Sequence, residues 1–324
     1  MKKIAMLGTF PQDGITLMEK ACENEFELVY VTKPEDVPLA KGASYVILRG
    51  IDITPKELDI LGPEVKLYHR WGVGFDTVDV EEAGRRGIPV GITTGVNSQS
   101  VAELAVLLML AGYRRLFDLA ERARQGIGKK EDITDNCYLL SGKKVGLLGL
   151  GNIGSRVCKM VSAFGAEVSY YDPFRATPER EAELGIKFVS FDEVIENSDI
   201  VSLHLPLMES TYHSIGKDVF KRMKNNALLV NTARGGIVDT DALMEALNEG
   251  EIWGAALDTT EIEPLPADHP LFGMERVIVL PHAGGSCRDL NAGMVECLME
   301  NIRTVDSGGR LHKRFLANAS YFND

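Results

Sequence analysis

Three side chains of the types that move protons and bind anions follow apolar segments in the last third of the chain. His282 comes directly after VIVLP, Arg234 follows ALLVNTA, and Glu263 lies in EIEP, shortly after GAALD ends at Asp258. Histidine exchanges a proton near neutral pH, and a neighbouring carboxylate favours its protonated form. Arginine presents a fixed fork of donors to a carboxylate or a carbonyl oxygen. These three residues are the candidate catalytic set, although each also has an ordinary explanation as a loop or ion-pair residue.

A glycine-rich turn, GLGNIG at residues 149–154, predicts a second kind of site. The apolar run KKVGLLG precedes the turn, and a segment with helical spacing follows it as far as Phe164. The next apolar run, AEVSYYD, ends at Asp172, 18 residues after Gly154. A strand, a glycine turn, a helix and an acidic residue at this spacing are typical of a dinucleotide site, with the diphosphate at the helix N-terminus. Asp172 would repel a 2′-phosphate, so NAD is expected rather than NADP; a turn without a ligand is the alternative.

The elements that must position these residues alternate between short apolar strands and helices. Strand candidates before residue 100 are residues 3–7, 26–31, 44–48, 66–69 and 89–92, with helix-compatible segments such as 14–22 and 54–61 between them. Strand candidates after residue 143 are 145–148, 167–171, 200–203, 227–230, 254–257 and 277–280. This alternation predicts an α/β fold with parallel sheets that carry helices on both faces. Ligands bind outside the carboxyl ends of such strands, so the polar residues after the later strands are expected to share one site.

Two longer helices are also predicted. Ser100 and Glu103 fit a capping box at the start of one helix, which is apolar nearly all round from 101 to 111 and is expected to be buried on every side. The other covers residues 289–305. Its apolar face is formed by Met294, Val295, Leu298, Met299 and Ile302.

Length and composition exclude several classes of protein. A chain of 324 residues favours two domains, and 45% apolar with 25% charged residues is typical of a globular protein. The formal charge of -12 argues against nucleic acid or an anionic membrane surface as a partner. The five cysteines are scattered and odd in number, which favours reduced thiols in the cytoplasm over disulfides or a metal site. The apolar runs are far shorter than the ~20 residues that a membrane helix needs.

Eight segments, in order and at matching spacing, resemble the D-isomer-specific 2-hydroxyacid dehydrogenases, and the resemblance covers nearly the whole chain. The segments are HRWGVGFDTVD (69–79), NSQSVAE (97–103), GLLGLGNIG (146–154), YYDP (170–173), HLPL (204–207), NTARGGIVD (231–239), GAALDTTEIEPLP (254–266) and PHAGGS (281–286). The resemblance implies a Rossmann NAD-binding domain, residues 100–286, inserted into a flavodoxin-like substrate-binding domain, residues 1–99 and 287–324. It also implies a homodimer, with contacts made by the NAD-binding domain and the helix near 101–115.

The resemblance also implies roles for particular residues. His282 would donate and accept the proton, Glu263 would be its partner, and Arg234 would bind and polarise the substrate as hydride passes between NAD and a D-2-hydroxy acid. The residues implied in NAD binding are Gly149, Gly151, Asn152, Ile153, Gly154, Asp172, Leu205, Pro206, Thr232, Ala233, Arg234, Asp258, His282, Gly284 and Gly285. Those implied in substrate binding are Arg49, Arg70, Trp71, Gly72, Val73, Gly74, Arg234 and His282, with backbone N–H groups of residues 72–74 on the substrate carboxylate.

The identity of the hydroxy acid is left open by the sequence. Arg49 and Arg70 match arginines that 3-phosphoglycerate dehydrogenases direct at their substrate, and the chain is most similar to that branch without its appended regulatory domain. Residues 50–52 and Trp71 depart from the pattern of the branch. Reductases of glyoxylate, hydroxypyruvate or branched 2-keto acids are therefore alternatives. A corepressor-like protein that senses NADH is an alternative of another class, and Glu263 argues against a formate dehydrogenase, in which glutamine is usual.

Overall fold

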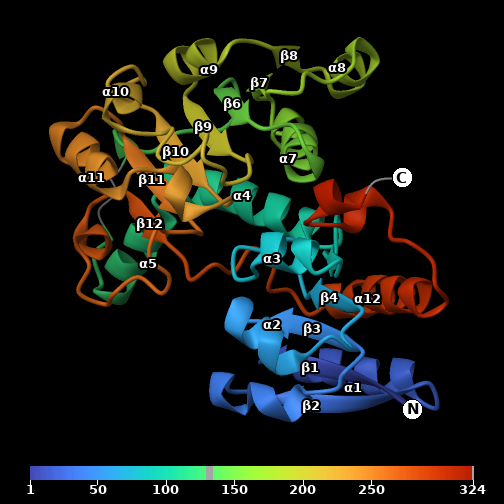
Figure 1. The fold of residues 1–324 in the computed structure, drawn as a ribbon. Helices are drawn as coiled ribbons and strands as arrows, with labels where there is room; N and C mark the ends of the chain where they lie inside the picture. Colours follow the sequence, from blue (N-terminus) through green and yellow to red (C-terminus); the bar gives the residue numbers. More distant parts are fainter. Residues whose placement is uncertain (129–133, 323–324) are drawn as a thin grey trace. The chain divides into compact units, whose positions relative to one another are not determined.

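The chain divides into two compact units, one inserted into the other. The structure is a computed structural model that describes residues 1–128 and 134–322. The first unit combines Met1–Asn97 with Gly285–Asp324, so it contains both the blue and the red parts of the ribbon in Figure 1. The second unit is Ser98–Gly284. The two-domain α/β fold expected from the sequence, a Rossmann domain inserted into a flavodoxin-like domain, is confirmed by the two parallel sheets.

The first unit is built on a five-stranded parallel sheet with the order β2-β1-β3-β4-β5. This order, 2-1-3-4-5, is that of flavodoxin-like proteins. Its strands are β1 (Lys2–Gly8), β2 (Phe26–Val31), β3 (Tyr45–Arg49), β4 (Leu67–Arg70) and β5 (Val90–Gly91). Side chains of a strand alternate between faces, so β1 places Ile4 and Met6 in one apolar core and Ala5 and Leu7 in another. The sheet is therefore covered on both faces, as the apolar strands predict.

Helices from both ends of the sequence cover this sheet. They are α1 (Gln12–Cys22), α2 (Pro55–Leu61), α3 (Val80–Arg85) and α12 (Leu290–Asp306), with the short 3₁₀ helices η1 (Pro34–Ala40), η4 (Lys313–Phe315) and η5 (Ala319–Tyr321). The predicted apolar face of α12 is confirmed, because Met294, Leu298 and Ile302 are buried in the core that contains Ile4 and Met6. Figure 1 shows α12 beside β4, which it contacts.

The second unit is built on a seven-stranded parallel sheet with the order β12-β11-β10-β9-β6-β7-β8. Counted along the chain, this is the 3-2-1-4-5-6 order of dinucleotide-binding folds with one further strand, and the order reverses between β6 and β9. The strands are β6 (Lys144–Leu148), β7 (Glu167–Tyr171), β8 (Lys187–Phe188), β9 (Ile200–Leu203), β10 (Leu228–Asn231), β11 (Gly254–Leu257) and β12 (Val277–Val279). All the predicted strands of this unit are present, and the two-residue β8 is an addition.

The helices of the second unit are α4 (Ser98–Tyr113), α5 (Leu116–Arg124), α7 (Asn152–Ala163), α8 (Pro178–Leu184), α9 (Phe191–Asn197), α10 (Lys217–Phe220) and α11 (Thr240–Glu249), with η2 (Gly235–Ile237) and η3 (Pro270–Gly273). The capping box predicted at Ser100 is wrong. The helix begins at Ser98, the Ser100 hydroxyl donates to the carbonyl of Gly284, and Glu103 accepts from Gln99. The helix is mostly buried, but Leu107 is 53% exposed, so burial on every side is also wrong.

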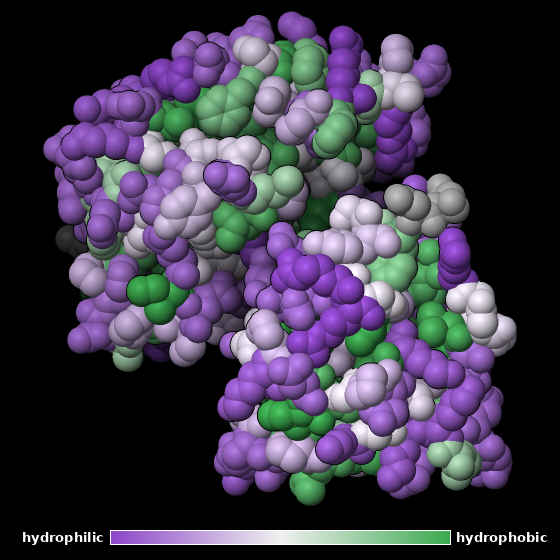
Figure 2. Space-filling model, viewed as in Figure 1, coloured by the Kyte–Doolittle hydropathy of each residue, from purple (hydrophilic) through white to green (hydrophobic). Residues whose placement is uncertain are grey.

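Figure 2 shows a largely hydrophilic surface on both units, with hydrophobic residues in separate small patches on the face drawn. This agrees with cores that are buried between helices and sheets. Among the described residues, no helix has the length and apolar character that crossing a bilayer requires. In the same parts of the chain, no group of three or more His, Cys, Asp or Glu residues is arranged to hold a metal ion.

Candidate active site

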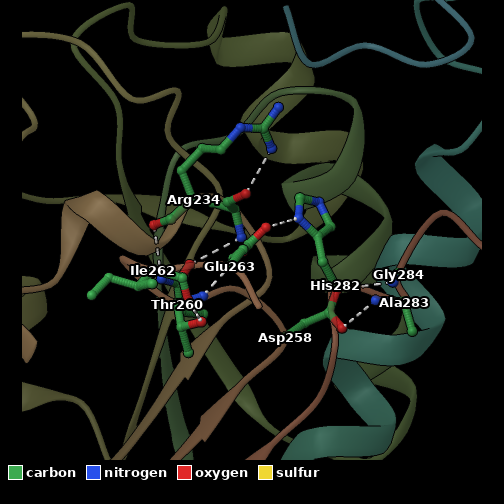
Figure 3. A network of polar contacts seen from close by, with 10 residues as sticks. Arg234, Asp258, Thr260, Ile262, Glu263, His282, Ala283 and Gly284 are labelled. Atoms are coloured by element: carbon green, nitrogen blue, oxygen red, sulfur yellow. Dashed lines mark hydrogen bonds and ion pairs between the residues drawn. The ribbon is translucent and has the colours of Figure 1, made fainter. Parts of the chain in front are cut away.

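The side chains of Glu263 and His282 meet at the carboxyl ends of two neighbouring strands. Glu263 follows β11 and His282 follows β12, and Oε2 of Glu263 lies 2.8 Å from Nδ1 of His282 (Figure 3). The second carboxylate oxygen, Oε1, accepts the N–H of Thr260 at 3.2 Å. Both carboxylate oxygens are thus engaged, and the hydrogen bond to Nδ1 leaves Nε2 of the imidazole as the nitrogen that can meet a substrate.

The two side chains change each other's pKa in the directions that acid–base catalysis requires. The hydrogen bond from Glu263 raises the pKa of His282 above its usual value, against the opposing effect of burial, and the charge of Glu263 adds to the increase. Burial would raise the pKa of Glu263, but the hydrogen bond and charge of His282, the N–H of Thr260 and the charge of Arg234 outweigh it and lower that pKa. The pair therefore holds a proton on the imidazole over a wider pH range than a free histidine would.

Backbone strain marks the position of His282. Its φ is 54°, in the left-handed region that few residues other than glycine adopt. Its N–H donates to the carbonyl of Asp258 at 2.8 Å. The buried carboxylate of Asp258 then accepts the next two N–H groups, Ala283 at 2.7 Å and Gly284 at 2.8 Å (Figure 3). Asp258, predicted from the sequence to bind NAD, thus fixes the turn that carries the imidazole; Gly285 follows directly in the chain.

Arg234 follows β10 and lies in the same group of side chains in Figure 3. Its guanidinium donates to the carbonyl of Ala233 at 2.8 Å. The turn is held by Asn231, which is fully buried. Its side-chain amide donates to the carbonyl of Arg234 at 2.9 Å and accepts the N–H of Ala233 at 3.0 Å. We did not predict Asn231 from the sequence, although a polar residue at the end of an apolar strand was the signal that could have identified it.

The glycine turn has the backbone geometry that a dinucleotide requires. Gly149 has φ +103°, and a Cβ at Gly154 would lie 2.2 Å from the carbonyl oxygen of Gly149, so side chains are excluded at both positions. A Cβ at Gly151 would meet nothing within 4 Å, so the space above this residue is open. The helix α7 begins at Asn152, which Ile153 follows, and no side chain caps its N-terminus. The N–H groups of this first turn are therefore free to bind a diphosphate.

Asp172 borders the glycine turn, and Thr232 and Leu205 follow other strands at the same edge of the sheet. Asp172 follows β7, and its two oxygens accept the N–H groups of Leu150 at 2.8 Å and Phe174 at 2.9 Å. Thr232 follows β10 and has a buried hydroxyl with no hydrogen-bond partner among the described residues. Leu205, which is buried, and Pro206 follow β9. An open glycine turn, an uncapped helix N-terminus and an unsatisfied hydroxyl at strand ends fit NAD.

A partly buried histidine beside the turn was not predicted from the sequence. His204 directly follows β9, and a Cβ at Gly149 would lie 2.8 Å from the backbone carbonyl of His204. Its Nε2 lies 3.0 Å from the hydroxyl of Ser202, and burial lowers the pKa of His204 to about 4. A neutral imidazole therefore packs beside the turn. Its chain position after an apolar strand was visible in the sequence, but its burial was not.

The first unit carries the other predicted substrate-binding residues. Arg49 ends β3 and donates to the carbonyl of Thr9, and burial lowers its pKa. Arg70 ends β4, and its Nε donates to the carbonyl of Gly74 at 2.8 Å, which closes the loop that contains Gly72 and Val73. These loop residues are partly exposed. The two arginines end neighbouring parallel strands, in which Leu48 is paired with Arg70.

Trp71 is buried in the core of the first unit. Its ring centroid lies 5.4 Å from that of Phe10, in an edge-to-face arrangement, and a Cβ at Gly14 would lie 3.0 Å from its ring. The residue before Arg70 is also buried: Nδ1 of His69 donates to the carbonyl of Arg70 at 2.9 Å, and its Nε2 accepts from the side-chain amide of Asn301 at 2.9 Å. A contact between Trp71 and a substrate stays a prediction.

Together, the fold and the side chains at its strand ends define a nicotinamide-dependent dehydrogenase. Residues 106–284 match the sequence model of the D-isomer specific 2-hydroxyacid dehydrogenase NAD binding domain. The chain therefore belongs to the D-isomer specific 2-hydroxyacid dehydrogenase family, and it is an NAD-dependent enzyme that transfers hydride between a 2-hydroxy acid and a 2-keto acid. The family, activity and cofactor predicted from the sequence are confirmed.

Three similar proteins illustrate the range of the family. The chain is 38% identical over 313 residues to a glyoxylate reductase of Thermococcus litoralis, which covers 94% of both proteins. It is 36% identical over 310 residues to a D-3-phosphoglycerate dehydrogenase of Methanocaldococcus jannaschii, which covers 95% of this chain and 58% of that protein. Its structure is similar to the NAD complexed form of a D-isomer specific 2-hydroxyacid dehydrogenase of Lactobacillus delbrueckii, with TM-score 0.79, 30% identity, and coverage of 98% and 100%.

Proposed function

We propose that the enzyme reduces glyoxylate and hydroxypyruvate, with His282 as the acid. The 2.8 Å hydrogen bond between Glu263 and His282 is the observation that carries this proposal. It fixes Nδ1 and keeps the ring protonated, so that Nε2 can give a proton to the oxygen of a 2-keto acid. Bound NADH supplies the hydride in this direction.

Arg234 supports the same step by charge. Its guanidinium lies among the side chains around His282, and its planar donors suit the carbonyl oxygen and the carboxylate of a 2-keto acid. Negative charge grows on that oxygen as hydride reaches the carbonyl carbon, and a fixed cation stabilises it until the proton from His282 neutralises it. In the oxidation of a hydroxy acid, the neutral imidazole accepts the proton. The backbone of residues 72–74 remains the predicted binder of the substrate carboxylate.

The choice of a small substrate rests on similarity to glyoxylate reductases. Arg70 donates its Nε to Gly74 and Arg49 donates to Thr9, so each guanidinium is oriented by a neighbouring loop. One hydrogen bond leaves a guanidinium with further N–H donors, so these contacts alone do not decide between a small acid and a phosphorylated one. The T. litoralis relative, by name a glyoxylate reductase, supports the small acid.

A second candidate substrate is 3-phosphohydroxypyruvate. The positions of Arg49 and Arg70 at neighbouring strand ends favour it, because two guanidinium groups can neutralise a phosphate. Similarity to a D-3-phosphoglycerate dehydrogenase adds support. The same protein cannot be selective for both substrates, so a direct comparison decides.

The experiment follows NADH consumption with glyoxylate, hydroxypyruvate, 3-phosphohydroxypyruvate and 2-ketoisocaproate. We expect the highest kcat/KM for glyoxylate or hydroxypyruvate, and Arg49→Ala should change all four values by similar factors. A preference for the phosphorylated acid, together with a selective loss of that preference in Arg49→Ala, would overturn the proposed substrate. Activity that survives in His282→Ala would overturn the proposed acid.

We further propose that the enzyme is a cytoplasmic homodimer. Half-exposed apolar side chains, Leu107 on α4 and Leu116 and Phe117 on α5, support a subunit contact on these helices. Cys22, Cys137, Cys158 and Cys297 are free thiols, which supports a reducing compartment. Light scattering should give the mass of a dimer and, for Phe117→Glu, of a monomer; cell fractionation tests the location.

A further inference from the structure

A second glutamate on the loop of Glu263 makes contacts that the proposed chemistry does not use. Oε1 of Glu261 lies 2.5 Å from Nε2 of His213 and accepts the hydroxyl of Tyr212 at 3.4 Å. Oε2 accepts the hydroxyl of Thr240 at 2.9 Å and its N–H at 3.4 Å. Glu261 is therefore bound by two other segments of the second unit, although it lies only two residues from Glu263 in the chain.

Those two segments are themselves tied to the turn of Arg234. Thr240 is the first residue of α11, five residues after η2 begins at Gly235. The N–H of His213 donates to the carbonyl of Gly236 at 2.9 Å, and its ring stacks on Tyr212 with centroids 3.9 Å apart. His213 also has φ 48°, a strained backbone position that its surroundings hold in place. Hydrogen bonds thus connect the side chain of Glu261 to residues that lie close to Arg234 in the chain.

Direct backbone packing joins the same two loops. A Cβ at Gly235 would lie 2.0 Å from the carbonyl of Thr260 and 2.4 Å from the nitrogen of Glu261. The residue after Arg234 is therefore in contact with the segment that leads to Glu263. Such close contact fixes the distance between the loops, while the side chain of Glu261 can fix the direction in which its own loop runs.

We infer that Glu261 is a positioning residue, which holds the loop so that the carboxylate of Glu263 stays on Nδ1 of His282. This inference rests on the roles proposed above for Glu263 and His282. Glu261 acts through its contacts with His213 and Thr240, and not by touching substrate.

The charges around the two glutamates are consistent with this arrangement. Burial would raise the pKa of Glu261, but the hydrogen bonds from His213 and Thr240 outweigh burial and lower it. On the other side of the His213 ring, Oδ2 of Asp239 lies 4.0 Å from Nδ1. The groups that face His282 are Glu263, Arg234 and Asp258. Among the described residues that these contacts name, no charged group is common to the two sets, so we expect a change at Glu261 to reach His282 mainly through the position of the loop.

The test compares Glu261→Ala, Glu261→Gln and Thr240→Ala with the wild type, and uses Glu249→Ala, which removes an exposed carboxylate from the end of α11, as the matched control. The measurements are kcat, KM, the Kd of NADH, the melting temperature and the pH profile of keto acid reduction. Active sites are counted by NADH titration, so that misfolded protein does not lower kcat artificially.

We expect Glu261→Ala to lower kcat by about 10–100-fold, because a misplacement of about 1 Å near reacting groups has effects of this size. The alkaline limb of the pH profile should move to lower pH, since the interaction that raises the pKa of His282 is weakened. Glu261→Gln keeps the length of the side chain and one accepting oxygen, and should restore part of kcat. Thr240→Ala should move the limb in the same direction by less, and Glu249→Ala should match the wild type.

An unchanged pH profile in Glu261→Ala and Thr240→Ala would overturn the inference, whether or not melting temperature falls, because a structural role alone leaves the profile in place. Should Glu261→Ala not fold, Thr240→Ala decides. Glu263→Gln separates this outcome from failure of the proposed function. If Glu263→Gln moves the alkaline limb and the Glu261 variant does not, only the inference fails; if neither moves it, the role proposed for Glu263 fails first.

Discussion

Glu263 and His282 belong to loops after the adjacent strands β11 and β12, and 2.8 Å separates the carboxylate oxygen from the ring nitrogen. The strands pair in parallel, with Leu257 opposite Val279, so both loops leave the sheet at the same edge. Neither loop alone raises the pKa of His282; the sheet brings the two side chains together by setting the register between the loops.

Replacing Glu263 by Gln tests the charge of this pair. The variant keeps an oxygen that can accept from Nδ1 but loses the negative charge, so the pKa of His282 should fall towards its ordinary value. If His282 is the acid proposed above, reduction requires the protonated ring, and its rate is lost as pH rises through that pKa. The loss should therefore begin at lower pH in the variant. At pH values above the midpoint of the wild-type profile, we expect kcat/KM of the variant to be lower than that of the wild type by a factor of about ten or more. Equal alkaline limits in steady-state profiles of the two proteins would contradict this.

Asp258→Asn should destabilise the second unit. The buried carboxylate accepts the N–H groups of Ala283 and Gly284, and an amide can accept only with its oxygen while its NH₂ faces a donor. Leaving one buried donor unsatisfied costs about 1–3 kcal/mol. Urea unfolding measures the change, and Asp241→Asn, at an exposed position of α11, is the control that should stay near the wild type.

Two alanine substitutions in the glycine turn should separate folding from cofactor binding. At Gly154 a Cβ would lie 2.2 Å from the carbonyl oxygen of Gly149, so Gly154→Ala should lower both the melting temperature and the affinity for NADH. At Gly151 the Cβ meets no protein atom within 4 Å, and φ is -69°. Gly151→Ala should keep the melting temperature and still weaken NADH binding, because the methyl group enters the space of the diphosphate. Tight binding by Gly151→Ala, followed by NADH fluorescence, would argue against this placement.

Two histidines with lowered pKa values, the buried His69 and the partly buried His204, should make the protein unstable in acid. Burial lowers the pKa of His69 and of His204 to about 4 in the folded state, from 6.5. The unfolded chain therefore takes up these protons first, and stability that is present above pH 6.5 is lost as pH falls from 6.5 to about 4. Each histidine contributes about 1.4 kcal/mol per pH unit across this window. His204→Gln should reduce the pH dependence of the unfolding free energy, whereas His312→Gln, at an exposed position, should not. Parallel curves for wild type and His204→Gln would refute the assignment.

The sequence predicts the regular part of this structure well. Strands such as 145–148 and 254–257 are continuous apolar runs between turn residues, so hydrophobic burial alone defines them. The pair of Glu263 and His282 was predictable as well, because parallel strands deliver their following residues to one edge of a sheet.

Features that depend on tertiary contacts were not predictable. Ser100 has the right neighbours for a helix cap, yet its hydroxyl binds the carbonyl of Gly284, which lies 184 residues away. The roles of Asn231 and Glu261 also depend on partners from other loops, which spacing along the chain does not identify. Local propensity is overridden wherever such distant partners are available.

The insertion of one unit into the other has a consequence for how the protein is made. Ile4 and Met6 pack against Met294 and Leu298, and the side chain of Asn318 bonds to Ile88 and Val90. On the ribosome, the earliest part of the chain must therefore wait until nearly all the rest has been synthesised. Meanwhile the segment Ser98–Gly284 contains every strand of its own sheet and can fold first. Pulsed proteolysis of stalled nascent chains should find that segment protected while the N-terminal ninety-seven residues are still cleaved. The reverse order of protection would show that other residues pack against the apolar face of β1 before α12 is made.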